Sequence, residues 1–344
     1  MTDGAGPAGQ HAGAPVRTVF LGSGRFGSPI LGRLVGHPSV DLVGVVTAPP
    51  RPVGRRQVET PTPIDSQARE LGLNVLTPAR LRDPAMLATV MDLDPDLVVL
   101  ADYGQLVPAP LLGRRHGALN LHPSLLPRHR GAAPIPATIL AGDPETGVSL
   151  MQMDAGLDTG PIVAVERAIL AGDETAPALE ARLAITAAGI LARSLDPLLD
   201  GELVPTRQGD VGATLTRPLR RADGRLDPRR SAIELERQVR AFLPWPGTFA
   251  ETNGVRVVVL DAAVAPSDPD DEPGRFVPDL SGLALATADG RLVLHDVQPA
   301  GGQPMSGEEY LRGRPRILGQ AIDWPPGNAA PPLFVAAGPT AGPA

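Results

Sequence analysis

The sequence contains no cysteine, which excludes disulfide bonds, thiolate nucleophiles and zinc sites built on sulfur ligands. It also contains no lysine, because all 31 of its Lys and Arg positions are arginine. Schiff-base chemistry and the lysine-dependent phosphate loop are therefore excluded as well. Aromatic residues make up only 3% of the chain, while apolar residues make up 42%. A core must be built from Leu, Val, Ile and Ala, a composition that favours an enzyme scaffold over a disordered or fibrous chain.

Long apolar runs are also missing, and none approaches the length needed to cross a bilayer. The first thirty residues do not combine a basic segment with an apolar one. We therefore expect a soluble, cytoplasmic protein with no membrane partner. A formal charge of -7 argues against a protein that binds nucleic acid over its whole surface, although binding at one place needs only one local basic face. A length of 344 residues favours two compact units.

Short apolar runs alternate with amphipathic stretches in the first part of the chain. Near-continuous apolar strands separated by helices predict an α/β domain with a mostly parallel sheet covered on both faces. A helix is expected from Thr175 to Leu199, and Asp83 with Pro84 should begin another. The expected strands are 16–21, 42–47, 97–101, 118–122 and 148–153.

The pattern changes after Gly201, where a passage rich in Pro and Arg leads to an expected helix at about 231–242. Short strands with Gly and Asp turns follow, and they predict a small β-barrel. The predicted organisation is a disordered extension at 1–15, a first domain at 16–201, a linker at 202–214, a second domain at 215–322 and a disordered tail at 323–344.

Residues 22–27, Gly-Ser-Gly-Arg-Phe-Gly, match the dinucleotide-binding fingerprint at the end of a predicted strand. That site also needs a carboxylate about 20 residues on, at the end of the second strand, to hold the ribose. Here the second strand ends Val-Val-Thr-Ala-Pro at 45–49, and Asp41 lies at its opposite end. A tight strand-to-helix turn is favoured, and a nicotinamide oxidoreductase stays as one alternative.

Polar side chains near two other predicted strands could form a site. Asn120 and His122 lie on one side of the strand 118–122, where open α/β sheets bind ligands, and the strand 148–153 leads into a glycine-flanked segment with Asp158. Acyl transfer to an amine needs donors for the developing oxyanion and a route for a proton. Asn120 can supply an N–H, His122 a second donor and a proton relay, and Asp158 can orient the imidazole. Each residue alone is more often a cap or turn former, but their shared placement favours a site.

These residues carry a resemblance. The segment 120–131, Asn-Leu-His-Pro-Ser-Leu-Leu-Pro-Arg-His-Arg-Gly, together with Gly-Leu-Asp-Thr-Gly at 156–160, resembles the folate-dependent formyltransferase family over roughly residues 16–320. The resemblance implies a Rossmann-like catalytic domain, 10-formyltetrahydrofolate as co-substrate and no metal. It implies that the catalytic residues are Asn120, His122 and Asp158, and that the folate pocket is lined by Ser124, Leu125, Leu126 and Pro127.

Two later segments, 240–247 and 297–307, resemble the family members that formylate methionine carried on initiator tRNA. This implies an OB-like second domain, methionyl-initiator tRNA as partner and a monomeric protein. An amino-sugar (nucleotide sugar) N-formyltransferase and an RNA-binding module with a vestigial catalytic domain stay as alternatives.

Basic surface for tRNA is expected in two places. The loop 50–57 carries arginines where the family often has lysine, and arginine keeps the charge while adding bidentate phosphate geometry. The passage 217–230 holds six arginines against two aspartates, although such a run can also be a solvated linker. By contrast, residues 301–303 are Gly-Gly-Gln where the family commonly carries lysines. The residues expected to bind tRNA are Arg51, Arg55, Arg56, Arg217, Arg220 and Arg221.

Overall fold

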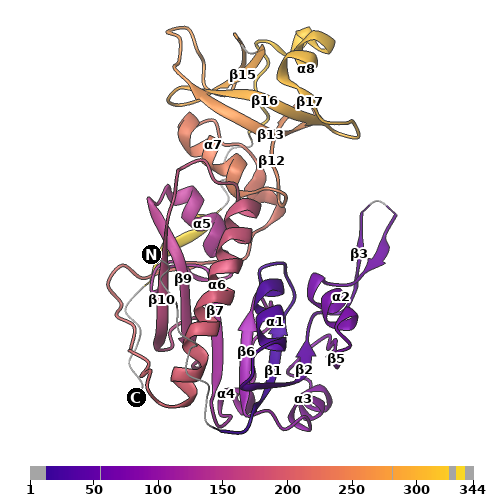
Figure 1. Ribbon diagram of the computed structural model, residues 1–344. Helices are drawn as coiled ribbons and strands as arrows, with labels where there is room; N and C mark the ends of the chain where they lie inside the picture. The colour runs from indigo at the N-terminus through magenta and orange to yellow at the C-terminus, as the bar shows by residue number, and fades with distance from the viewer. Residues whose placement is uncertain (1–12, 55, 281, 325–330, 338–344) are drawn as a thin grey trace, which may run out of the picture.

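The computed structural model describes residues 13–54, 56–280, 282–324 and 331–337, which form two domains (Figure 1). The first contains a seven-stranded sheet in the order β10-β9-β7-β6-β1-β2-β5. Its parallel strands are β1 (Val16–Gly22), β2 (Val40–Val46), β5 (Val75–Leu76), β6 (Leu97–Ala101) and β7 (Ala118–His122). The two strands β9 (Glu145–Gln152) and β10 (Ile162–Ile169) complete it in antiparallel pairing. The predicted mostly parallel sheet is confirmed.

Helices cover both faces of this sheet. One face packs against α1 (Gly27–Val35), α2 (Pro63–Glu70), α5 (Pro134–Ala141) and α6 (Ala176–Leu199), and the other against α3 (Pro84–Met91) and α4 (Ala109–Leu112). The expected helix starts are observed: the Asp83 carboxylate accepts the Ala85 N–H at 3.0 Å, and the Thr175 hydroxyl accepts the Ala178 N–H at 3.4 Å. No helix in the described residues is long and apolar enough to cross a membrane.

The second domain is a curled antiparallel half-barrel with its own core, so the predicted fold class is confirmed. Its strands are β12 (Thr248–Thr252), β13 (Val255–Ala265), β14 (Phe276–Asp279), β15 (Gly282–Ala286), β16 (Arg291–Pro299) and β17 (Met305–Ser306). Its helices are α7 (Ala232–Ala241), α8 (Gly307–Gly313) and a 3₁₀ turn at Pro315–Ile317. Helix α7 packs against α5 (Figure 1). Phe242 at its end is buried in the core of the first domain.

The segment predicted as a linker is bonded into the first domain. Strand β11 (Thr214–Thr216) pairs in parallel with β8 (Arg130–Gly131), which begins three residues after the end of the predicted folate segment. The expectation that the second domain begins at 215 is therefore wrong. The sequence gave no sign of this pairing, because a strand of three residues is too short to show the alternation of polar and apolar residues that marks a strand.

The predicted disorder of the tail is also wrong in part. Strand β18 (Phe334–Ala336) pairs with β11, and Leu333 is buried in the first core. Phe334 lies edge-on to the ring of His129 at 5.6 Å. Buried Leu333 and half-buried Phe334 supply the burial that offsets the entropy of ordering this segment. Residues 1–12, from the predicted N-terminal extension, lie outside the described residues.

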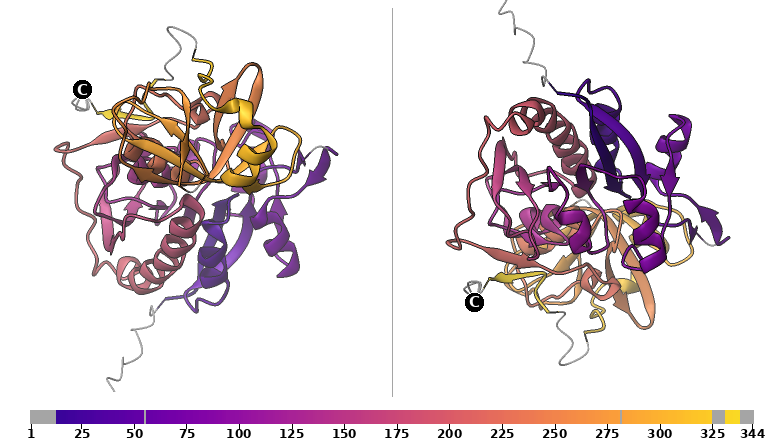
Figure 2. Two further views of the ribbon diagram at one scale, coloured as in Figure 1. Left: turned by 90° about the horizontal axis from the view of Figure 1, so that it is seen from above. Right: turned by 90° about the horizontal axis from the view of Figure 1, so that it is seen from below.

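A hairpin of β3 (Arg51–Val53) and β4 (Val58–Thr60) stands away from the first domain. It projects on the side where the second domain lies (Figure 1), and both views of Figure 2 show it separate from the rest of the fold. Val53 and Val58 are exposed on it. The hairpin therefore presents Arg51 and Arg56 to solvent.

Candidate active site

Strand β7 places Asn120 and His122 on one face of the sheet. Leu119 and Leu121 alternate with them and pack in the core that contains α6, so the two polar side chains point to the other face. Asn120 is 6% exposed and His122 is 4% exposed. Polar groups this buried need partners. The partner of Asn120 comes from the loop after β9, and that of His122 from the segment after β7.

Asp158 meets both residues, as the sequence predicts. Its Oδ1 accepts a hydrogen bond from Asn120 Nδ2 at 3.1 Å, and its Oδ2 accepts the Gly131 N–H at 2.8 Å. Oδ2 also lies 3.7 Å from His122 Nδ1. The backbone of Asp158 is in the left-handed region, with φ 52°, a conformation that aspartate tolerates better than most residues. An amide, an imidazole and a carboxylate thus surround one small volume.

The hydrogen bond on the far side of His122 defines its tautomer. His122 Nε2 lies 2.9 Å from the carbonyl oxygen of His129, and a carbonyl only accepts, so Nε2 carries a proton. In the neutral ring Nδ1 then carries no proton, and it faces Asp158. The sequence-based expectation gave His122 two roles, donor and relay. The geometry favours the relay, because neutral His122 can accept a proton at Nδ1 but cannot donate one there.

A half-buried ionic group supports the loop that holds His122. Asp143 accepts hydrogen bonds from His129 Nε2 at 2.8 Å and Arg128 Nε at 3.0 Å. Burial alone would raise the pKa of Asp143, but these bonds and the Arg128 charge outweigh it and hold the pKa below its ordinary value. Since His129 supplies the carbonyl that orients His122, this group fixes the rear of the site.

We expect Asp143→Asn to lower the free energy of unfolding by about 2 kcal/mol at pH 7, the scale of a hydrogen bond to a charged group. A depressed carboxyl pKa stabilises the fold above the unfolded value of about 3.9, and this contribution is lost as pH falls through the folded pKa. The difference in free energy of unfolding between wild type and variant should therefore become smaller as the pH is lowered. Urea unfolding from pH 7 downward measures it, with the exposed Asp270→Asn as control. A gap that stays constant with pH would contradict the assignment.

The predicted folate segment follows β7. Ser124 is fully buried, and its hydroxyl donates to the Arg128 carbonyl at 2.7 Å, so this side chain bonds within the loop and not to the surface expected to hold folate. Leu125, Leu126 and Pro127 are half-buried. These three side chains leave apolar surface beside the polar group formed by Asn120, His122 and Asp158.

The glycine turn at 22–27 does not fit a dinucleotide. A β-carbon added at Gly24 would lie 1.5 Å from Asp102 Oδ2, so the Asp102 carboxylate occupies the place where a backbone-bound phosphate would approach. The alternative of a nicotinamide oxidoreductase is therefore disfavoured. Among the described residues, no three His, Asp or Glu side chains gather as metal ligands.

The arginines expected to bind tRNA fall into three groups. Arg51, Arg56, Arg220 and Arg221 are exposed, as that role requires, and Arg55 lies outside the described residues. Arg217 is different, because it makes two hydrogen bonds of 2.8 Å to the carboxylate of Asp223. Its side chain is only 20% exposed and that of Asp223 5%, so the geometry favours a structural role for Arg217 over the expected contact with tRNA. Much of the apparent charge surplus is likewise paired, as in Arg225 with Glu251, Arg229 with Asp227 and Arg230 with Glu234.

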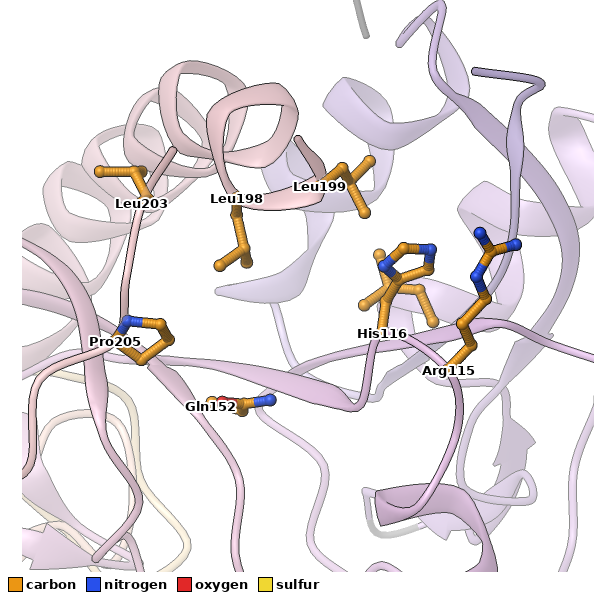
Figure 3. A pocket seen from close by; sticks show the side chains of 8 residues that line it. Arg115, His116, Gln152, Leu198, Leu199, Leu203 and Pro205 are labelled. Atoms are coloured by element: carbon orange, nitrogen blue, oxygen red, sulfur yellow. The ribbon is translucent and has the colours of Figure 1, made fainter. Parts of the chain in front are cut away.

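A cavity of about 210 Å³ lies elsewhere (Figure 3). Its walls include Leu97, the first residue of β6, and Leu198 and Leu199 from the end of α6. Asn120 and His122 point to the face of the sheet opposite α6. The cavity is therefore separate from the polar group, and its other walls are Arg115, His116, Gln152, Leu203 and Pro205.

Gln208 was missed by the sequence analysis. It lies in the predicted linker, yet it bonds to the backbone of Asp158 and to Arg130. A lone glutamine in a polar loop gives no pattern that could have identified it.

Comparisons with known proteins cover both domains. Residues 16–195 match the family described as "Formyl transferase", and residues 218–315 match "Formyl transferase, C-terminal domain". The chain is 41% identical over 300 residues to the methionyl-tRNA formyltransferase of Roseiflexus castenholzii, covering 87% of this chain and 96% of the relative. It is 43% identical over 304 residues to the enzyme of that name from Paramagnetospirillum magneticum, covering 87% and 97%.

Its fold is similar to a crystal structure of an N-formyltransferase from Helicobacter canadensis in complex with folinic acid and dTDP-3-aminofucose. The TM-score is 0.61 at 15% identity, over 84% of this chain and 100% of the other. At that identity the likeness concerns the fold alone.

Proposed function

The chain belongs to the formyl transferase family in both of its domains, and from this we propose that it formylates the α-amino group of methionine carried on initiator tRNA. The observation that carries the proposal is the meeting of Asn120, His122 and Asp158 in a chain that shares 41–43% identity with named methionyl-tRNA formyltransferases. The amino-sugar alternative is not favoured, because its support is a likeness of fold at 15% identity. A vestigial catalytic domain is not favoured either, since all three groups are in place.

The proposed formyl donor is 10-formyltetrahydrofolate, and the residues beside the polar group fit such a molecule. Leu125, Leu126 and Pro127 are half-buried, and Leu157, next to Asp158, is 51% exposed. Apolar surface of this kind suits the flat ring system of a folate, with a few polar groups fixing its orientation. When bound, the folate supplies the formyl group on its N10 atom.

Asn120 is the proposed oxyanion donor. One hydrogen of its amide nitrogen bonds to Asp158, which orients the group, and the second hydrogen is left for an oxygen that gains negative charge. The methionyl amine forms its new bond to the formyl carbon, and the pair of electrons of the C=O bond moves to that oxygen. A fixed donor in a nearly buried site stabilises this charge without reorganisation.

His122 and Asp158 are the proposed route for the proton. Bare Nδ1 of His122 accepts the proton from the attacking nitrogen, and the facing Asp158 carboxylate stabilises the imidazolium that forms. The C–N10 bond then breaks, and the same proton returns to N10 of the leaving tetrahydrofolate. The products are a formamide and tetrahydrofolate, and no residue forms a covalent bond.

A formyl-transfer assay with 10-formyltetrahydrofolate tests the function. Methionyl-initiator tRNA is offered beside a dTDP-amino sugar, and the formylated product is quantified for each. We expect transfer to the tRNA only. Transfer to the sugar alone, or to neither acceptor, would refute the proposed function.

Exposed arginines are proposed to contact the tRNA, whereas Arg217 stabilises the fold. Replacing both Arg220 and Arg221 with alanine should weaken binding and lower the slope of log K against log salt by about 0.7–0.9 per lost phosphate contact. Arg217→Ala should leave that slope unchanged and lower the free energy of unfolding by about 3 kcal/mol, because it removes the guanidinium paired with the buried Asp223 carboxylate, which then keeps the Arg220 N–H at 2.7 Å. Filter binding at several salt concentrations and urea unfolding measure the two effects. A reduced salt slope for Arg217→Ala would contradict its structural role.

A further inference from the structure

Both ends of the Gln208 side-chain amide are hydrogen-bonded, and these partners fix its orientation. Nε2 donates to the carbonyl of Asp158 at 2.9 Å and to that of Gly160 at 2.7 Å. Oε1 accepts from Arg130 Nε at 3.1 Å and Nη2 at 2.8 Å. Carbonyls cannot donate and a guanidinium cannot accept, so the amide has one possible orientation. Gln208 thus bridges the Asp158 loop to a buried arginine.

The segment around Gln208 bonds to the same two parts of the site at further points. Thr206 and Ile162 exchange two backbone hydrogen bonds of 2.8 Å just beyond the Asp158 loop. The Thr216 hydroxyl donates to the Arg130 carbonyl at 2.9 Å, and Asp210 Oδ1 lies 3.7 Å from Arg130 Nη1. Arg130 itself is 2% exposed. The segment 206–216 therefore joins the β8 segment to the loop that carries Asp158.

The Asp158 loop needs an external restraint of this kind. Asp158 has φ 52°, a sparsely populated conformation, and its carboxylate must reach Asn120 and His122 at the same time. The loop is short of space, because a β-carbon at Gly160 would lie 1.8 Å from the Gln152 carbonyl oxygen. The carboxylate is held by two donors, but within the described residues only Gln208 bonds by its side chain to the carbonyls at 158 and 160.

We propose that Gln208 is a positioning residue for formyl transfer, which fixes the backbone at 158–160 so that the Asp158 carboxylate stays at Asn120 and His122. This inference rests on the proposed function of these three residues. Gln208 touches neither substrate in the mechanism above. Its loss should therefore act on the chemical step and leave substrate binding in place.

Gln208→Glu tests this with the smallest change of shape. The carboxylate keeps its partner Arg130 but loses both donors and repels the carbonyls at 158 and 160. We expect kcat to fall about 10- to 100-fold, since a displacement near 1 Å can cost 10²-fold in rate. The KM for both substrates should stay within about twofold. Hydrogen exchange of a peptide spanning 154–162 should accelerate, a measurement that needs no catalysis.

Gln238 provides a matched control in α7. It is 2% exposed, accepts from Arg230 Nη1 at 2.9 Å and donates to the Arg225 carbonyl at 3.3 Å, so Gln238→Glu makes the same chemical change away from the site. It should lower the unfolding temperature without lowering kcat. If Gln208→Glu does not fold, Gln208→Asn, too short to span both partners, serves in its place with the same expectation.

The outcomes separate the two proposals. A wild type that formylates no acceptor refutes the function, whereas the exchange result still tests the restraint on the loop. An active wild type with unchanged kcat and exchange in the Gln208 variants overturns the positioning role. A kcat loss in Gln238→Glu as large as that in Gln208→Glu would also overturn it, because the effect would then follow stability alone.

Discussion

Asp158→Asn is expected to lower kcat by about 10²- to 10⁴-fold, the range for a group that takes part in proton transfer. The two carboxylate oxygens accept from different donors, Asn120 Nδ2 on Oδ1 and the Gly131 N–H on Oδ2. An amide has only one accepting oxygen, so its NH₂ group must face one of these donors. The charge opposite His122 is lost as well. Single-turnover formyl transfer at saturating substrates measures the effect.

Asp154 supplies a control in the same loop. Its Oδ1 alone accepts both the Gly156 N–H at 2.9 Å and the Thr159 hydroxyl at 2.8 Å. An asparagine at 154 keeps both bonds through its single accepting oxygen, so Asp154→Asn should retain kcat. If both variants lost activity equally, the loss would reflect the charge or order of the loop in general. Full activity in Asp158→Asn would remove this carboxylate from the mechanism.

The elements that carry the site could be predicted because their patterns are local. Strand β7 is a short apolar run in which two polar residues share one face, and α3 and α6 begin at capping residues that the sequence identifies. The meeting of Asp158 with Asn120 required only that two predicted strands be neighbours, and β7 and β9 do pair. The resemblance to a family then indicated which of the polar residues at the strand ends should be catalytic.

Other features depend on contacts that no local pattern records. The Arg217 charge is visible in the sequence, but its burial against Asp223 depends on the fold, so a count of charges overstated the basic surface. Strand β18 is three residues in a tail rich in Pro and Gly, and its order comes from burial of Leu333 in a core formed far away in sequence. Strand β10 was missed because its polarity does not follow its burial: Val165 and Ile169 are exposed while Glu166 is half-buried, so no alternation of polar and apolar residues marks it.

Asn120→Ala is expected to lower kcat by about 10²- to 10³-fold, the cost of removing one oxyanion donor. An oxyanion exists only after the amine has attacked, so KM for both substrates should change little. The exposed Asn74→Ala is the control, because it removes the same amide far from Asp158 in the sheet.

A second effect of Asn120→Ala follows from its bond to Asp158. Asn120 Nδ2 orients the carboxylate at 3.1 Å, so the variant removes a restraint on the proton route together with the oxyanion donor. The losses in Asn120→Ala and Asp158→Asn should then fail to add, and the double variant should be far less impaired than the product of the two single effects. Additive losses would mean that the two groups act independently, which their direct hydrogen bond argues against. An unchanged kcat in Asn120→Ala would leave the oxyanion without the donor assigned to it.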